Sequence, residues 1–186
     1  LVKHALANKT VVRLKGGDPF IFGRGGEEIQ EVVRHGIFFE SIPGITAASA
    51  AASRAGIPLT HRDHAQSLQF VTACKKLGAP NENYSELLDS TQTVVFYMGL
   101  HRLDEMTKGL IEAGRDGATP FAIISHASLP TQQVLIGTLK DIAEQQASAS
   151  LPTPALLIMG DVVNLYGEFA NYNLASLSQT LEVSCV

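Results

Sequence analysis

The chain has 186 residues, of which 45% are hydrophobic and 17% are charged, a balance that excludes extended disorder. Fourteen basic and eighteen acidic residues give a formal net charge of −4, which argues against a general nucleic-acid or membrane surface. Any acidic ligand must therefore be bound by local arginines.

The cysteines and the apolar runs indicate where the protein resides. Cys74 and Cys185 lie far apart, which disfavours a disulfide framework or a thiolate metal site. No apolar run approaches the ~20 residues of a membrane span, and no signal peptide is recognised. These features predict a cytoplasmic protein. Because the sequence starts at Leu1 with what resembles the tail of a helix over His4–Asn8, we also expect an upstream part to be missing.

The first informative stretch is a predicted strand followed by a glycine-rich turn. Residues 11–14 (Val-Val-Arg-Leu) predict a buried strand that ends at Gly16 and Gly17. Adjacent glycines allow positive φ and remove the Cβ atoms, so that a ligand can lie directly on the backbone. Asp18 adds a carboxylate that could accept from ribose hydroxyls or an amino group. The turn therefore predicts a ligand site at the end of a strand.

A second glycine cluster spans residues 23–26 (Gly-Arg-Gly-Gly). It places the Arg24 guanidinium just before a predicted helix over residues 27–35, where charge and free backbone N–H groups favour an anion. The alternative is an ordinary glycine-rich turn with a solvated arginine, since glycine spacing alone is weak evidence. Neither cluster fits a phosphate-binding loop or a dinucleotide fingerprint.

The chain then continues with elements that predict the end of one domain. Residues 37–42 predict a short strand, and the turn over residues 43–47 leads into an Ala- and Ser-rich helix over residues 47–55, with Thr46 as its cap. The polar, proline-marked segment that follows predicts an interdomain link. The expected division is an N-terminal domain remainder over 1–60, a linker over 61–66, a C-terminal domain over 67–170 and a tail over 171–186.

The second half alternates strands and helices. Strands are predicted over residues 68–73, 93–97, 121–124, 133–137 and 155–159, and helices over 101–113 and 138–146. The short turn before residues 133–137 favours an antiparallel pairing. The turns at Met98-Gly99 and Ala127 each follow a predicted strand. The turns at Gly16-Gly17 and residues 43–47 do the same. The pattern predicts an α/β fold with an open sheet in each of two domains, whose turns could converge on one cleft.

Several of these stretches together resemble a known family. Residues 13–28, 43–47 and 56–63 and the pair Met98-Gly99 resemble, in the same order, the tetrapyrrole methylases. Within that family they are most similar to the uroporphyrinogen-III C-methyltransferases that form the methylating module of sirohaem synthases. The resemblance extends to about Val163. It implies a two-domain α/β enzyme, incomplete here, in which an open, mostly parallel sheet precedes a second, mixed sheet domain. It also implies a homodimer.

The resemblance further implies the cofactor and its binding residues. S-adenosylmethionine would fold into the cleft between the lobes and leave as S-adenosylhomocysteine. The implied cofactor-binding residues are Gly16, Gly17, Asp18, Ile21, Thr46, Ala47, Met98 and Ala127, the last at a position where relatives often have glycine.

The implied substrate is a polycarboxylate tetrapyrrole. Arg24 and Arg62 are the implied substrate-facing arginines, and a guanidinium pairs with a carboxylate bidentately. Glu27 is close enough to Arg24 to orient it, or to meet a pyrrole N–H. For Arg62 the alternative is an ion pair with Asp63.

The implied reaction methylates two ring carbons in turn to give precorrin-2, without a metal. A metal site at His61, Asp63 and His64 is the alternative, although three side chains within four residues cannot easily converge.

Two other hypotheses for the function stay open. One is a related methylase that acts on a later corrin precursor, on diphthine or on ribosomal RNA. The other is a non-catalytic domain that only binds cofactor or dimerises, because the family's first glycine- and proline-rich turn and its proposed acid and base lie upstream of this sequence.

Overall fold

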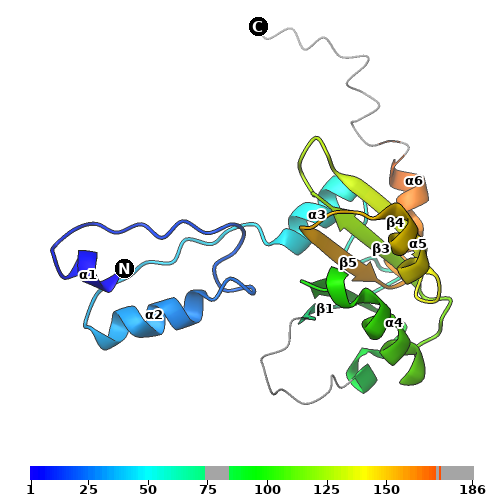
Figure 1. The fold of residues 1–186 in the computed structure, drawn as a ribbon, viewed down its shortest axis with the longest axis horizontal. Coiled ribbons are helices and arrows are strands. Elements are labelled where there is room, and N and C mark those ends of the chain that lie inside the picture. Colours follow the sequence, from blue (N-terminus) through cyan, green and yellow to red (C-terminus); the bar gives the residue numbers. More distant parts are fainter. Residues whose placement is uncertain (74–83, 171, 173–186) are drawn as a thin grey trace, which may run out of the picture. The chain divides into compact units, whose positions relative to one another are not determined.

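The structure is a computed structural model that describes residues 1–73, 84–170 and 172 (Figure 1). The chain separates into two compact units, Leu1–Ser49 and Ala50–Val186. The boundary falls within the helix Ala47–Ala55.

The first unit contains the helices α1 (Val2–Ala5) and α2 (Gly25–Arg34), and α3 (Ala47–Ala55) begins at its end. The predicted helices over residues 27–35 and 47–55 are confirmed as α2 and α3. Helix α2 stops at its C-cap His35, after which Gly36 adopts a φ of +67°, the left-handed conformation that commonly ends helices.

The two strands predicted in the first unit are not formed. Residues 11–14 and 37–42 run as extended traces in Figure 1, but neither belongs to a β-strand. Val12 is 81% exposed and Phe38 is fully exposed, so the expectation of a buried strand is wrong for this chain. The sequence suits a strand, but a strand forms only where a neighbour accepts its backbone hydrogen bonds and buries its apolar face. The described residues of the first unit provide neither.

The second unit is built on a five-stranded sheet with the order β1-β2-β5-β3-β4. The strands are β1 (Ser67–Thr72), β2 (Gln92–Tyr97), β3 (Pro120–Ser125), β4 (Gln133–Thr138) and β5 (Ala155–Met159). β1 and β2 are parallel, whereas β5 runs antiparallel to both β2 and β3. All five predicted strands are confirmed, as is the antiparallel pairing of β4 with β3.

Short helical segments connect the strands. They are η1 (Tyr84–Leu87), η2 (Leu100–Arg102), α4 (Leu103–Glu112), α5 (Ile142–Ala149), η3 (Asp161–Leu165) and α6 (Tyr166–Ala170). The helix predicted from Thr138 begins one turn later, because Thr138 still belongs to β4. Asp141 occupies the N-cap position of α5, and its Oδ1 accepts from the Thr138 N–H at 2.7 Å rather than from an N–H of the helix.

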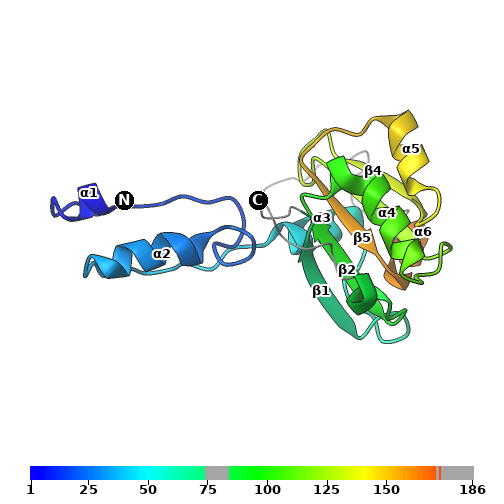
Figure 2. The same ribbon diagram turned by 60° about the horizontal axis from the view of Figure 1, so that its bottom comes forward.

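The core of the second unit lies between the sheet and its helices. Apolar side chains of α4 and α5 pack on one sheet face against Phe96 and Phe121, which stack at a ring distance of 6.4 Å. Figures 1 and 2 show α3 on the opposite face, where Ala51, Ala52 and Ala55 are buried. Because alanine is small, this helix can approach the sheet closely. Over the described ranges, the helices include none with the length and apolar character needed to cross a membrane.

Candidate functional site

The two predicted ligand turns of the first unit lie against each other. The Asp18 carboxylate joins them, since its Oδ1 accepts from the Phe20 N–H at 2.9 Å and its Oδ2 from the Gly44 N–H at 3.1 Å. A Cβ atom at Gly44 would lie 2.4 Å from the Gly17 carbonyl oxygen. The contact is therefore backbone against backbone, and only glycine fits at position 44 without a shift.

The same hydrogen bonds fix the charge of Asp18. Donation by the Phe20 and Gly44 N–H groups lowers the pKa of its carboxyl, which outweighs the small opposing effect of desolvation. Asp18 is therefore an anion at neutral pH. The sequence suggested a ligand acceptor, and the structure adds a second task, because this carboxylate connects two turns 26 residues apart.

The backbone beside Asp18 is open to a ligand. Gly17 has a φ of +84°, and a Cβ at Gly16 would meet nothing within 4 Å. A Cβ at Gly17 would lie 3.6 Å from the Ile45 oxygen and 3.9 Å from the Ala47 nitrogen, so Gly17 lies beside the start of α3. The structure thus brings together the predicted residues Gly16, Gly17, Asp18, Thr46 and Ala47.

The glycines of the second cluster, residues 23–26, pack the loop onto Pro19. The sequence had suggested an anion-binding turn there. The Gly25 N–H donates to the Pro19 oxygen at 2.9 Å, and Cβ atoms at Gly23 and Gly25 would lie 2.7 Å and 2.6 Å from that oxygen. These glycines therefore let the chain fold tightly onto Pro19. Ile21 lies in the same loop, where its N–H donates to the Asp18 oxygen at 3.4 Å.

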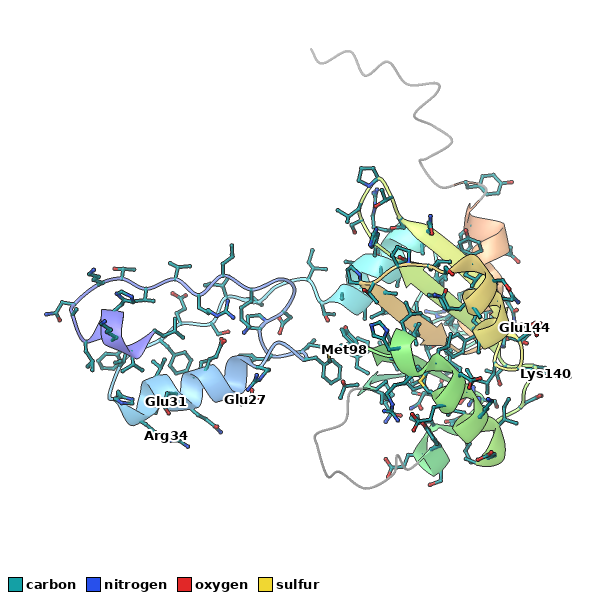
Figure 3. The ribbon with its side chains drawn as sticks, in the orientation of Figure 1. Glu27, Glu31, Arg34, Met98, Lys140 and Glu144 are labelled. Atoms are coloured by element: carbon teal, nitrogen blue, oxygen red, sulfur yellow. The ribbon has the colours of Figure 1, made fainter. Side chains whose placement is uncertain are left out.

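Arg24 projects from this compact loop at the start of α2. Its side chain is 81% exposed, and its Nε lies 3.4 Å from Glu27 Oε1, one turn along the helix. The pKa of Glu27 is lowered by the hydrogen bond from its own backbone N–H and, to a smaller extent, by Arg24. Figure 3 labels Glu27 on α2, and its side chain is 62% exposed. The pair thus presents a guanidinium whose orientation is restrained by a carboxylate.

Sequence reasoning missed an ion-pair cluster next to the same turn. Glu28 Oε1 accepts from Arg13 Nε at 3.2 Å, and its Oε2 accepts from Lys15 Nζ at 2.9 Å. Lys15 directly precedes Gly16. The partners are 13 and 15 residues apart, so no helical or strand spacing rule could have linked them.

In the second unit, Met98 and Ala127 lie at the same edge of the sheet. Met98 follows β2 and Ala127 follows β3, while β5 runs between these strands in the opposite direction. The register pairs Tyr97 with Leu156 and Ser125 with Ala155. The two turns are thus separated by two interstrand spacings, about 10 Å. Met98 has a φ of 57° and is exposed at this edge (Figure 3).

The turn that carries Ala127 is fixed by its neighbours, which sequence reasoning also missed. Ser125 Oγ donates to the Pro152 oxygen at 2.5 Å. His126 Nε2 lies 2.9 Å from the Thr153 oxygen and its Nδ1 lies 3.1 Å from Thr131 Oγ1. A carbonyl can only accept, so Nε2 carries a proton and donates it to the Thr153 oxygen. The side chain of His126 therefore orders this turn.

Arg62 lies at the other edge of the same sheet. Its loop precedes β1, where the loop residue His64 bonds through Nδ1 to Asp161, which follows β5. The Asp63 carboxylate lies 3.9 Å from His61 Nδ1, and within the described ranges no ion pair joins it to Arg62. The described residues also include no group of three or more His, Cys, Asp or Glu side chains arranged to hold a metal ion.

Comparison with known proteins decides the family. The model of the Tetrapyrrole (Corrin/Porphyrin) Methylases matches residues 1–143. The chain belongs to the tetrapyrrole methylase family. It is 63% identical to a siroheme synthase of Psychrobacter arcticus over 94% of this chain and 32% of that protein. It is 50% identical to a siroheme synthase of Thiobacillus denitrificans over 92% of this chain and 36% of that protein. This tetrapyrrole methylase chain thus spans about a third of the length of these curated relatives.

Solved tetrapyrrole methylases share its fold. The uroporphyrin-III C-methyltransferase of Thermus thermophilus, crystallised with S-adenosylhomocysteine, is 38% identical with a TM-score of 0.74, over 88% of this chain and 71% of that one. A cobalt precorrin-4 methyltransferase is 25% identical with a TM-score of 0.77, over 87% of this chain and 68% of that one. The Gly16–Gly17 turn of this tetrapyrrole methylase chain leaves room for a ligand of this kind, because both glycines are exposed and a Cβ atom at Gly16 would meet nothing within 4 Å.

Proposed function

We propose that the chain carries the S-adenosylmethionine-dependent C-methylation of uroporphyrinogen III, at two ring carbons, to give precorrin-2 for sirohaem or cobalamin biosynthesis. The observation that carries the proposal is the pair of touching turns around Asp18, which leaves the Gly16–Gly17 backbone open. The similarity to siroheme synthases and to a uroporphyrin-III C-methyltransferase complexed with S-adenosylhomocysteine supports this choice of substrate and cofactor.

The proposed cofactor contacts come from all four turns. Gly16, Gly17 and the start of α3 offer backbone groups without Cβ atoms in the way. Met98 and Ala127 add contacts from the sheet edge of the second unit. When bound, S-adenosylmethionine supplies an electrophilic sulfonium methyl group. The task of the protein is then to hold the ligand in one orientation and keep water away from the reacting atoms.

The proposed substrate contacts are made by exposed arginines. Arg24 would pair with a carboxylate of the tetrapyrrole, and the nearby Glu27 would restrain the guanidinium or accept from a pyrrole N–H. Arg62 would meet another carboxylate. Two arginines suit a polycarboxylate ligand because each can form a bidentate pair. We further propose that the working unit is a cytoplasmic homodimer, which light scattering of the purified chain would test.

Calorimetric titration of the full chain with S-adenosylhomocysteine tests the proposal first. We expect micromolar binding, and mass spectrometry after incubation with S-adenosylmethionine and uroporphyrinogen III should show a gain of two methyl groups. Failure of a folded chain to bind the product would contradict the enzymatic reading and favour a domain that only dimerises. The second candidate function is methylation of a later corrin precursor, the activity named for the cobalt precorrin-4 methyltransferase. Methyl transfer to a cobalt precorrin and not to uroporphyrinogen III would favour it.

A pair of arginine variants separates substrate binding from cofactor binding. Arg24→Ala should raise the KM for the tetrapyrrole about tenfold, because a charge-assisted bidentate contact is lost, and should leave the affinity for S-adenosylhomocysteine unchanged. Arg34→Ala is the matched control, because Arg34 lies at the other end of α2 and pairs with Glu31 (Figure 3). Equal effects of the two variants would contradict the assignment of Arg24.

A further inference from the structure

The ion-pair cluster around Glu28 is not explained by the contacts proposed so far. Glu28 is in the first turn of α2, and its two carboxylate oxygens accept from different cations, Arg13 and Lys15. Residues two apart in an extended segment point to the same side. The Glu28 carboxylate therefore binds two side chains on the same side of residues 13–15, the segment that leads into the Gly16-Gly17 turn.

The burial of Lys15 makes this contact more than a surface ion pair. Its side chain is only 12% exposed, and its Nζ lies 2.9 Å from Glu28 Oε2. A cation that is mostly removed from water needs a close anion, and loss of that anion leaves it unpaired. The hydrogen bond from Lys15, followed by that from Arg13, lowers the pKa of Glu28, so the anion is present at neutral pH.

The segment held by Glu28 has little other support. It belongs to no strand, and Val12 and Leu14 on its other side are exposed. Arg13 also donates through Nη1 to the Leu14 oxygen at 2.7 Å, which stiffens the segment locally but does not attach it to the helix. The attachment to α2 through Glu28 therefore substitutes for the hydrogen-bonded ladder that a strand would provide.

We propose that Glu28 is a positioning residue for the cofactor turn, which through Lys15 and Arg13 holds Gly16, Gly17 and Asp18 at a fixed distance from α2. The proposal rests on the proposed cofactor role of that turn. Both Glu28 oxygens accept from the cations, so the proposal gives Glu28 no cofactor contact of its own. Its effect on the ligand is transmitted by the backbone between Lys15 and Gly16.

A double-mutant cycle tests this transmission. We expect Glu28→Gln to weaken binding of S-adenosylhomocysteine about tenfold, because Lys15 loses its anion. Lys15→Met should weaken it to a similar extent, and the double variant should be no weaker than either single one. Additive losses would overturn the proposal, since they would mean that Glu28 acts on the ligand without Lys15. Glu31→Gln is the matched control one helical turn further on, where Glu31 pairs with Arg34, and should leave the affinity within about twofold.

Hydrogen exchange of the ligand-free chain provides a second readout that does not require cofactor binding. Glu28→Gln should speed amide exchange at Gly16, Gly17 and Gly44 about tenfold, with the sheet of the second unit unchanged. Unchanged exchange at these glycines would overturn the positioning role even if affinity fell. If the parent chain binds no S-adenosylhomocysteine, the proposed function fails, and the exchange result still decides whether Glu28 holds the turn.

Discussion

The two units of the chain are stabilised in different ways. The second unit buries Phe96, Phe121 and the apolar side of α4 in a continuous core around a hydrogen-bonded sheet. The first unit has no strand among its described residues, and its ligand turns are held by a carboxylate that accepts from backbone N–H groups and by the ion pairs of Glu28. Apolar burial does not depend on ionisation, whereas these polar contacts do. The first unit should therefore respond to charge and pH, and the second to side-chain volume.

Truncation of a phenylalanine should show the largest difference between the two units in the free energy of unfolding. Phe121→Ala, at a fully buried position of β3, should lower the free energy of unfolding by about 3–5 kcal/mol, because it removes apolar contacts and leaves a cavity. Phe38→Ala in the first unit should change it by less than about 0.5 kcal/mol, since that side chain is fully exposed. Urea denaturation measures both. Similar losses would mean that Phe38 is buried in solution and that the contrast between the units is wrong.

A substitution at the contact between the two ligand turns should have the next largest effect. Gly44→Ala puts a Cβ atom 2.4 Å from the Gly17 oxygen, so the turns must separate and the hydrogen bond to Asp18 must lengthen. We expect the affinity for S-adenosylhomocysteine to fall at least about tenfold, because a misplaced binding group loses much of its effect. Gly26→Ala in α2 is the control, where a Cβ meets nothing within 4 Å, and calorimetry should show little change. Unchanged binding in Gly44→Ala would remove the turn contact from the site.

The smallest expected effect is the pH dependence of the Asp18 contact. Because the folded state lowers the pKa of Asp18 below its ordinary value of 3.8, the ionised carboxylate stabilises the fold fully above that value. This stabilisation is lost as the pH falls through the lower, folded pKa. Asp18→Asn should therefore unfold at a lower urea concentration than the parent at pH 7, and the gap should narrow as the pH falls below about 3.8 and close below the folded pKa. A gap that persists there would show that charge is not the cause.

The sequence predicted the second unit well, and the reason is local. Each strand from β1 to β5 is an apolar run of suitable length that ends at small or polar residues. The helices α2 and α3 were equally readable from spacing and from their glycine ends. The strands predicted in the first unit failed because β-propensity describes how a segment fits a neighbouring strand, and the described residues contain no such neighbour.

The sequence predicted which residues belong to the candidate site. It did not predict the hydrogen bonds and ion pairs that join them. Gly16, Gly17 and Asp18 stood out as a strand-end turn, and Arg24 as an arginine before a helix. The hydrogen bond from Gly44 to Asp18 spans 26 residues and the Lys15 ion pair spans 13, distances at which no spacing rule applies. These bonds depend on how the chain folds back, which a single sequence does not encode in any short pattern.

The exposed apolar side chains of the first unit have a consequence for handling the protein. Val12, Leu14, Phe38 and Ile42 are solvent-exposed, and their segments belong to no strand of the part of the chain that the structure describes. Such segments are templates for pairing with another chain. Self-association in concentrated solution should therefore increase with protein concentration and decrease when a lysine replaces Val12. A dimer that persists after that replacement would not depend on the segment that carries Val12.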